Sequence, residues 1–176
     1  MKKILFTITL CTGLLFLTAC GSNSLNVNKT KSDKYNELSY EVPESFSKIK
    51  LDDMDEINSE GTLKFSDYKY EYLNKGSNGK YDDGCYLKFS HDSDFSDYTI
   101  ERYADIFSEG KKGTSKTING IEWYIVKDDA DPKFIEYEYY ARYNNKFYNV
   151  SYSDWGSGNL CAEALTVIEN SLKFSK

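Results

Sequence analysis

Alternating apolar and polar residues predict an antiparallel hairpin in the last third of the chain. Every second residue from Ile135 to Tyr143 is apolar or aromatic, and the alternation resumes from Tyr148 to Tyr152 after Asn144-Asn145. Paired asparagines favour a tight turn, and period-two alternation is typical of strands covered on one side. The opposite, polar face is left either to solvent or to a docking partner.

Further strand signals lie upstream of this hairpin. Residues 85–90 alternate in the same way, and Asn119-Gly120 marks a second tight turn that leads into a strand over Ile121–Lys127. A break in the alternation predicts a bulge or turn near Ser66-Asp67. The sequence therefore predicts a sheet of several antiparallel strands.

Helical stripes predict two helices. The first has Ser96 as its expected N-cap and ends at Gly110, with a buried stripe of Ile100, Tyr103, Ala104 and Phe107. The second begins near Ser157–Asn159, and its buried positions are Leu160, Cys161, Ala164, Leu165, Ile168 and Leu172. Strands, a helix, more strands and a closing helix predict an α+β domain, an antiparallel sheet flanked by two main helices.

The N-terminal segment has the pattern of an export signal. Lys2 and Lys3 precede an apolar stretch that is shorter than the roughly 20 residues of a transmembrane helix. The stretch ends in Leu17-Thr18-Ala19-Cys20, which resembles a bacterial lipoprotein box. That resemblance implies cleavage before Cys20, acylation of Cys20 and anchoring on the extracytoplasmic face of the cell membrane. The alternatives are an uncleaved anchor and a conventional secretory cut.

Composition then divides the chain into three parts. Residues 1–19 are the predicted signal peptide, and residues 20–37 are predicted as the lipidated cysteine and a flexible tether. The tether is rich in Ser, Asn, Lys and Thr and has too little apolar surface to offset its ordering entropy. Residues 38–176 are predicted to form one α+β domain of ordinary size.

The charge balance argues against nucleic acid as a partner. The formal net charge is −6, and loss of Lys2 and Lys3 with the signal would make it −8. Such a charge repels phosphate backbones and anionic headgroups. Membrane association is therefore expected through the lipid anchor, and not through the folded part.

Three short segments are similar to the PsbP-like family: Tyr40-Glu41-Val42-Pro43 with Phe46, Asn119–Tyr124, and Glu169–Phe174. The resemblance spans Leu38 to Phe174, and family members often carry Trp where Phe46 stands. It implies a PsbP-like sandwich that serves as a noncatalytic scaffold, without naming a ligand.

Two cysteines are candidates for a disulfide. Cys85 lies on the inward face of a predicted strand, and Cys161 lies on the inward stripe of the last helix. A disulfide persists outside the cytoplasm. In the chain-entropy model, closing this loop would stabilise the folded state by about 4–5 kcal/mol. Two separate buried thiols are the alternative.

A cluster of oxygen ligands surrounds the single histidine. His91, Asp92, Asp94 and Asp97 are weak candidates for a calcium or manganese site. Their spacing departs from the calcium-loop pattern, so a polar loop that leads into a capped helix is the favoured interpretation. No cofactor is expected.

No catalytic motif is present, so the sequence favours a binding protein over an enzyme. The first hypothesis is a protein-interaction or accessory module with an envelope or membrane protein as partner. The second is a receptor for a small molecule such as a glycan or peptide. Candidate contact residues are Trp155, Tyr140 and Trp123. Core packing is the favoured interpretation of Trp123, whereas the Gly-rich loop around Trp155 makes Trp155 the first choice.

Overall fold

The computed structural model describes residues 27–49, 64–71, 84–95, 97–131, 134–154 and 159–175. The signal segment, Cys20 and Trp155 lie outside these residues. Within them the chain forms two antiparallel sheets and two helices, which makes the domain α+β as predicted.

The main sheet has seven strands in the order β3-β4-β5-β9-β8-β7-β6. Their bounds are β3 Ser47–Ile49, β4 Lys64–Glu71, β5 Gly84–Asp92, β6 Gly113–Ile118, β7 Ile121–Asp131, β8 Phe134–Tyr143 and β9 Lys146–Asp154. The two predicted turns join β6 to β7 and β8 to β9. All four turn residues have positive φ, namely Asn119 (49°), Gly120 (82°), Asn144 (47°) and Asn145 (63°), as a type I′ hairpin turn requires.

The bulge predicted in β4 was wrong. β4 pairs with β5 in unbroken register from Lys64 opposite His91 to Glu71 opposite Gly84. On its other side β4 pairs with β3, with Ile49 opposite Asp67. Backbone pairing on both sides therefore keeps β4 regular although its apolar alternation breaks near Ser66-Asp67. The irregularity lies instead in β7, between Asp128 and Asp131.

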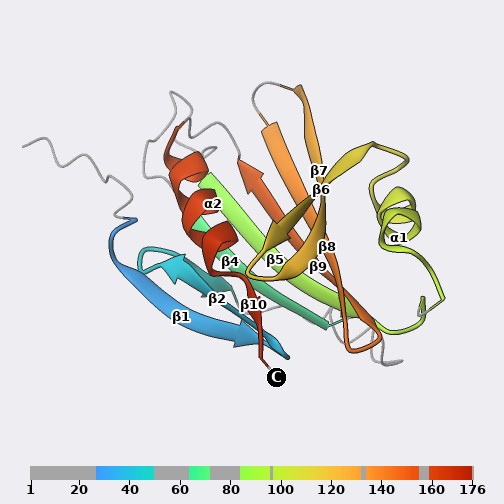
Figure 1. Cartoon of the computed structure of the whole chain (residues 1–176). Coiled ribbons are helices and arrows are strands. Elements are labelled where there is room, and N and C mark those ends of the chain that lie inside the picture. The colour runs from blue at the N-terminus through green and yellow to red at the C-terminus, as the bar shows by residue number, and fades with distance from the viewer. Residues whose placement is uncertain are drawn as a thin grey trace, which may run out of the picture.

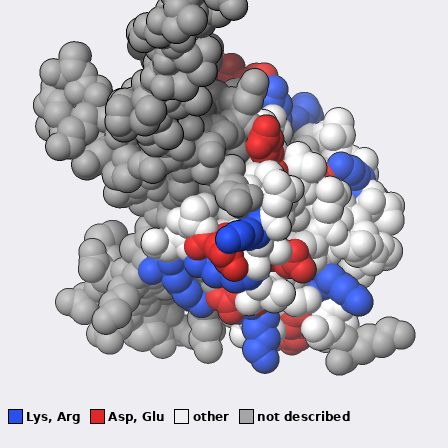
Figure 2. Space-filling view, turned by 90° about the vertical axis from the view of Figure 1, so that its left-hand side faces the viewer, with Lys and Arg blue, Asp and Glu red and all other residues white. Residues whose placement is uncertain are grey.

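A smaller sheet consists of β1 Thr30–Tyr35, β2 Leu38–Pro43 and β10 Lys173–Phe174, in the order β1-β2-β10. The predicted tether was therefore wrong from Thr30 onward. Most residues of β1 are polar, and Tyr35 is its one buried residue. The strand is therefore stabilised by backbone pairing with β2, since it has no apolar face of its own. On the side of the molecule that carries β1, side chains of both charges interleave (Figure 2), and Lys48 pairs with Asp33 at 3.1 Å.

The two helices lie on opposite faces of the main sheet. α2 Asn159–Ser171 and the smaller sheet cover one face, and α1 Ile100–Phe107 covers part of the other (Figure 1). α1 begins one turn later than predicted. Thr99 is its N-cap and accepts a hydrogen bond from the Arg102 amide, and the helix closes with Gly110 N–H bonded to the Asp105 carbonyl.

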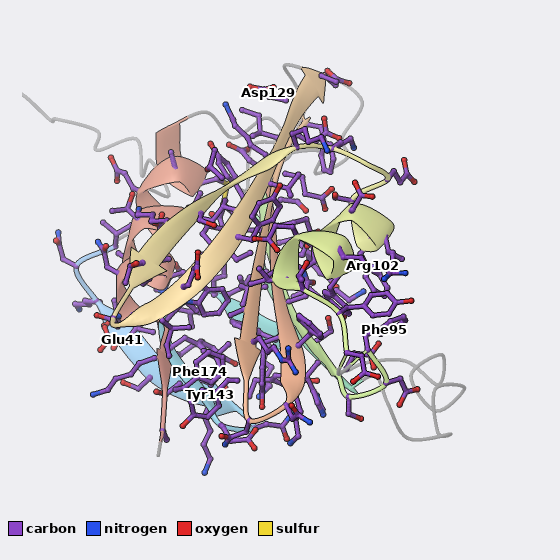
Figure 3. The ribbon with its side chains drawn as sticks, turned by 45° about the vertical axis from the view of Figure 1, so that its right-hand side comes forward. Glu41, Phe95, Arg102, Asp129, Tyr143 and Phe174 are labelled. Atoms are coloured by element: carbon purple, nitrogen blue, oxygen red, sulfur yellow. A yellow bond between two sulfur atoms is a disulfide. The ribbon has the colours of Figure 1, made fainter. Side chains whose placement is uncertain are left out.

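The main core lies between the seven-stranded sheet, α2 and the smaller sheet, and aromatic rings dominate it. Tyr40 stacks on Phe89 at 3.9 Å between ring centroids, and Tyr143 stacks on Phe174 at 4.3 Å (Figure 3). The predicted inward positions of α2 from Cys161 to Leu172 are buried in this core, namely Cys161, Ala164, Leu165, Ile168 and Leu172. Large aromatic rings thus supply much of the buried apolar area that aliphatic side chains supply in other cores.

Candidate functional site

The cysteine pair is structural. Cys85 and Cys161 form a disulfide across a Cα–Cα distance of 5.6 Å and a sequence separation of 76 residues. Both residues are buried. Of the two alternatives that the sequence left open, the structure has the disulfide, which links β5 to the first turn of α2.

Two of the three aromatic residues proposed as a contact surface lie in the interior. Trp123 is 0% exposed and Tyr140 is 1% exposed. The core packing favoured for Trp123 is therefore confirmed, and Tyr140 as a residue of a binding surface was wrong. Trp123 stacks on Phe174 in the main core, and Tyr140 packs edge-on against Tyr103 of α1. Each side chain points from its strand toward an element that packs over the sheet. The alternation of residues along a strand does not show which element covers it. Trp155 lies outside the described residues.

The structure separates the candidate metal ligands. His91 and Asp92 are neighbours on β5 and therefore point to opposite faces of the sheet. The Nδ1 atom of His91 lies 2.9 Å from the Tyr35 hydroxyl, whereas Asp92 accepts a hydrogen bond from the Asp94 amide. Among the described residues no group of three or more His, Cys, Asp and Glu side chains is placed to hold a metal ion.

The exposed hydrophobic surface that the sequence did not single out lies on α1. Ile106 is 48% exposed and Phe107 is 45% exposed, the two exposed large hydrophobics among the described residues. Phe107 was predicted to be buried. α1 has only eight residues, and its buried side is filled by Tyr103 and Ala104. We call Phe95, Tyr98, Arg102, Ile106 and Phe107 the α1 surface.

Ring contacts hold the α1 surface in place. The Phe95 ring lies edge-on to Phe107 at 5.8 Å and to Tyr98 at 5.3 Å, and the Arg102 guanidinium lies 4.1 Å from the Tyr98 ring centroid. Figure 3 shows Phe95 and Arg102 on the same side of the molecule, next to α1. Four of its residues, Phe95, Tyr98, Arg102 and Phe107, are therefore linked by ring and cation–π contacts, and Ile106 precedes Phe107 on the helix.

Beneath α1 a second, smaller core anchors the helix. Tyr103 stacks on Phe147 at 4.2 Å with an interplanar angle of 6°, and Ala104, Val126 and Tyr140 complete the cluster. Burial raises the pKa values of Tyr103 and Tyr140 well above their ordinary range. Both hydroxyls therefore stay protonated across the physiological range.

A hydrogen-bonded polar strip runs along the same face of the main sheet. Its members on β8 and β9 are Glu136, Glu138, Asn149, Ser151 and Ser153. The Ser151 and Ser153 hydroxyls each donate to Glu136 Oε1 at 3.3 Å, and the Asn149 amide donates to Glu138. The sequence did identify this polar face, because its residues alternate with the core residues of the hairpin.

Burial raises the pKa of Glu138, and the charge of Glu136 acts in the same direction. Hydrogen bonds from Asn149 and Ser151 oppose this effect by stabilising the carboxylate. The strip therefore holds one carboxylate whose ionisation is disfavoured.

Comparisons with known proteins support the fold alone. No protein-family model matches the chain, and no curated protein matches it. A solved structure from Bacteroides thetaiotaomicron VPI-5482 is similar, with a TM-score of 0.51 and 11% sequence identity over 84% of this chain and 48% of that chain. The chain thus spans about half the length of that protein. Within the described residues, neither helix is long and apolar enough to cross a bilayer.

Proposed function

We propose that the chain is a lipid-anchored protein on the extracytoplasmic face of the cell membrane, and that its domain is a noncatalytic protein-interaction module. Cys20 carries the anchor, and the α+β domain is a PsbP-like scaffold. The α1 surface contacts an envelope or membrane protein. The sequence of residues 17–20 supports the anchor, and the three PsbP-like segments support the scaffold.

One observation carries the interaction role. The two exposed large hydrophobics among the described residues, Ile106 and Phe107, are consecutive on one short helix, and the Phe107 ring contacts the Phe95 ring. The Phe95 ring in turn contacts Tyr98, which carries the Arg102 guanidinium over its face. Aromatic residues and arginine are enriched at the centres of protein interfaces. Exposure costs free energy when no partner covers such a surface, so a partner explains its composition.

Site-specific photocrosslinking tests the interaction role. A benzoylphenylalanine is introduced at Phe107 of the full-length, lipidated protein, and the matched control carries the same group at Glu163, an exposed position on α2. We expect one reproducible crosslinked protein from position 107 that is absent from position 163. Phe107→Asp, combined with a crosslinker at Ile106, should abolish that product while the protein remains folded at the assay temperature. Equal products from both positions would contradict the role of the α1 surface.

The anchor has its own test. Cys20→Ala should abolish labelling with an alkyne analogue of palmitate and block cleavage before residue 20, so that the variant keeps residues 1–19. Palmitate labelling that persists in Cys20→Ala would contradict acylation of Cys20, and a wild-type protein that keeps residues 1–19 would indicate the uncleaved N-terminal anchor.

The polar strip favours a second candidate function, a receptor for a small hydroxyl-bearing molecule such as a glycan or a peptide. Glu138 supports it, because burial raises the pKa of its carboxyl group and Asn149 and Ser151 donate hydrogen bonds to it. A thermal-shift screen of glycans and short peptides tests this candidate. A ligand that stabilises the wild-type protein and not Glu138→Ala would support it, and equal stabilisation of both would place the ligand elsewhere.

A further inference from the structure

We propose that β6 is a docking edge, to which an extended acidic segment of another protein adds as an antiparallel strand. This surface is separate from the α1 surface, so the two proposals can fail independently. β6 is the last strand of the seven-stranded sheet and pairs only with β7 among the described strands.

The register of the β6–β7 hairpin shows which backbone groups face outward. Ile118 pairs with Ile121 across the two-residue turn, and the ladder continues without a shift to Gly113 opposite Val126. In such a hairpin every second residue directs its N–H and C=O away from its partner strand. Ser115 and Thr117 therefore present these groups at the outer edge, whereas the Gly113 amide donates to the Tyr124 hydroxyl at 2.9 Å.

The side chains around this edge leave it accessible. Thr114, Ser115, Lys116 and Thr117 are four consecutive exposed residues, so neither face of β6 is covered over this stretch. Threonine and serine at these positions are compatible with an extended strand. As far as the described residues show, the edge is thus a regular template for one more strand.

Other strand edges of the described structure are protected in ways that β6 is not. β3, at the opposite end of the main sheet, has three residues, and β10 has two. β1 is long but carries three charged residues, Lys31, Asp33 and Lys34. Short length and charge are the usual protections of an edge strand. β6 has six residues, no proline and one charge, and that charge, Lys116, is paired with Glu169 of α2.

The hairpin is also held rigidly before any partner arrives. The Asn119 side-chain amide donates to the carbonyl oxygens of Asn170 and Leu172, each at 2.9 Å. Lys116 pairs with Glu169 on the same helix. Because these bonds tie β6 to α2, strand addition would need little ordering of the edge itself.

The charges near β6 favour an acidic partner segment. Between Gly110 and Ile121 the chain has three lysines, at 111, 112 and 116, and no acidic residue, in a protein of net charge −6. Lys111 pairs with Asp128 at 2.5 Å, whereas Lys112 forms no ion pair with any described residue. A second copy would bring the same acid-free segment from Gly110 to Ile121, which offers Lys112 no counter-charge. An acidic extended segment is therefore the complementary partner.

The probe is an acetylated, amidated decapeptide of alternating Thr and Glu, titrated into the extracytoplasmic part of the protein and followed by amide NMR. We expect saturable shifts at Ser115 and Thr117 and at least tenfold slower hydrogen exchange of both amides. The matched Thr-Lys peptide should bind at least tenfold more weakly, as should a Thr-Glu peptide methylated on every second backbone nitrogen.

Variants of the protein complete the test. Ser115→Pro removes an outward N–H without removing a β6–β7 hydrogen bond and should weaken peptide binding at least tenfold, whereas Ser115→Ala keeps the amide and should bind like the wild type. If Ser115→Pro fails to fold, the methylated peptide still decides the outcome. Equal binding of acidic, basic and methylated peptides, or shifts confined to other strands, would overturn the proposal. So would a dimer in light scattering that Ser115→Pro converts to monomer, since it would identify a second copy as the occupant.

Discussion

The Tyr152 hydroxyl donates a hydrogen bond to the carbonyl oxygen of Cys161 at 2.6 Å, beside the disulfide that joins Cys161 to Cys85. Tyr152 and Cys85 lie on adjacent, paired strands, β9 and β5. The first turn of α2 is therefore fixed to the main sheet at two neighbouring points, one covalent and one polar. Its position does not depend on packing alone.

Removal of the disulfide should destabilise the domain strongly. Reduction, or the double change Cys85→Ala and Cys161→Ala, is expected to lower the free energy of unfolding by about 4–5 kcal/mol in the chain-entropy model. Urea denaturation with and without reductant measures this effect. The double variant should not respond to reductant, and a wild-type midpoint that is unchanged by reduction would contradict the disulfide.

Tyr152→Phe removes the hydroxyl and keeps the ring. We expect a loss of about 1 kcal/mol in unfolding free energy, the usual net value of one hydrogen bond. Tyr143→Phe is the matched control, because the Tyr143 hydroxyl donates to the Ser175 carbonyl at the surface, at 3.0 Å. Urea midpoints of the two variants should differ, with the Tyr152→Phe midpoint lower, and equal midpoints would contradict the role of Tyr152.

Glu138 should make stability fall as the pH rises. Burial raises the pKa of Glu138 above its ordinary value of 4.5, so the folded state holds its proton more tightly than the unfolded state does. Its contribution is fully present below pH 4.5 and is lost as the pH rises through the folded pKa. Relative to the wild type, Glu138→Gln should therefore be more stable at pH 8 than at pH 4, by about 1.4 kcal/mol for each pH unit that separates the two pKa values.

Glu37 supplies a control of opposite sign in the same thermal-denaturation series. The Tyr148 hydroxyl donates to its carboxylate and lowers its pKa below 4.5, and Lys146 acts in the same direction. Its contribution is present above pH 4.5 and is lost as the pH falls through the folded pKa. Glu37→Gln should thus cost stability at pH 7 and cost little at pH 2. Parallel pH profiles for the two variants would contradict both assignments.

Truncation of Trp123 should cost far more stability than truncation of Phe107. Trp123→Ala creates a cavity in the main core and is expected to cost about 3–5 kcal/mol. Phe107→Ala changes a half-exposed side chain at the end of α1 and should cost under about 1 kcal/mol. Chemical denaturation of both variants checks the contrast. A mild effect of Trp123→Ala would indicate that this ring is not packed in the core.

Local signals predicted the parts of the fold that depend on local chemistry. Asn119-Gly120 and Asn144-Asn145 identify hairpin turns because few residues adopt positive φ at both central positions. The inward stripe of α2 was also correct from Cys161 to Leu172, since this helix buries one continuous side. The α+β class follows from these elements together.

Features that depend on distant partners were not predicted. β1 is polar and exists because β2 pairs with it, so composition alone indicated a tether. Tyr140 has the alternation of a polar face, and only the placement of α1 over that face buries it. The α1 surface was missed because a helical stripe does not reveal which of its residues the sheet reaches. Spacing likewise left the disulfide open, since it does not fix the distance between Cys85 and Cys161.

The pairing of β10 with β2 means that the smaller sheet can be completed only after almost all of the domain has been synthesised. Phe174 pairs with Leu38, and the Ser175 amide donates to the Glu37 carbonyl at 2.8 Å. During synthesis the β1–β2 hairpin is produced early and cannot complete its sheet until residues 173–174 emerge. Of the described strands β10 is the last in the chain, so the smaller sheet is complete only after every strand of the main sheet has been synthesised.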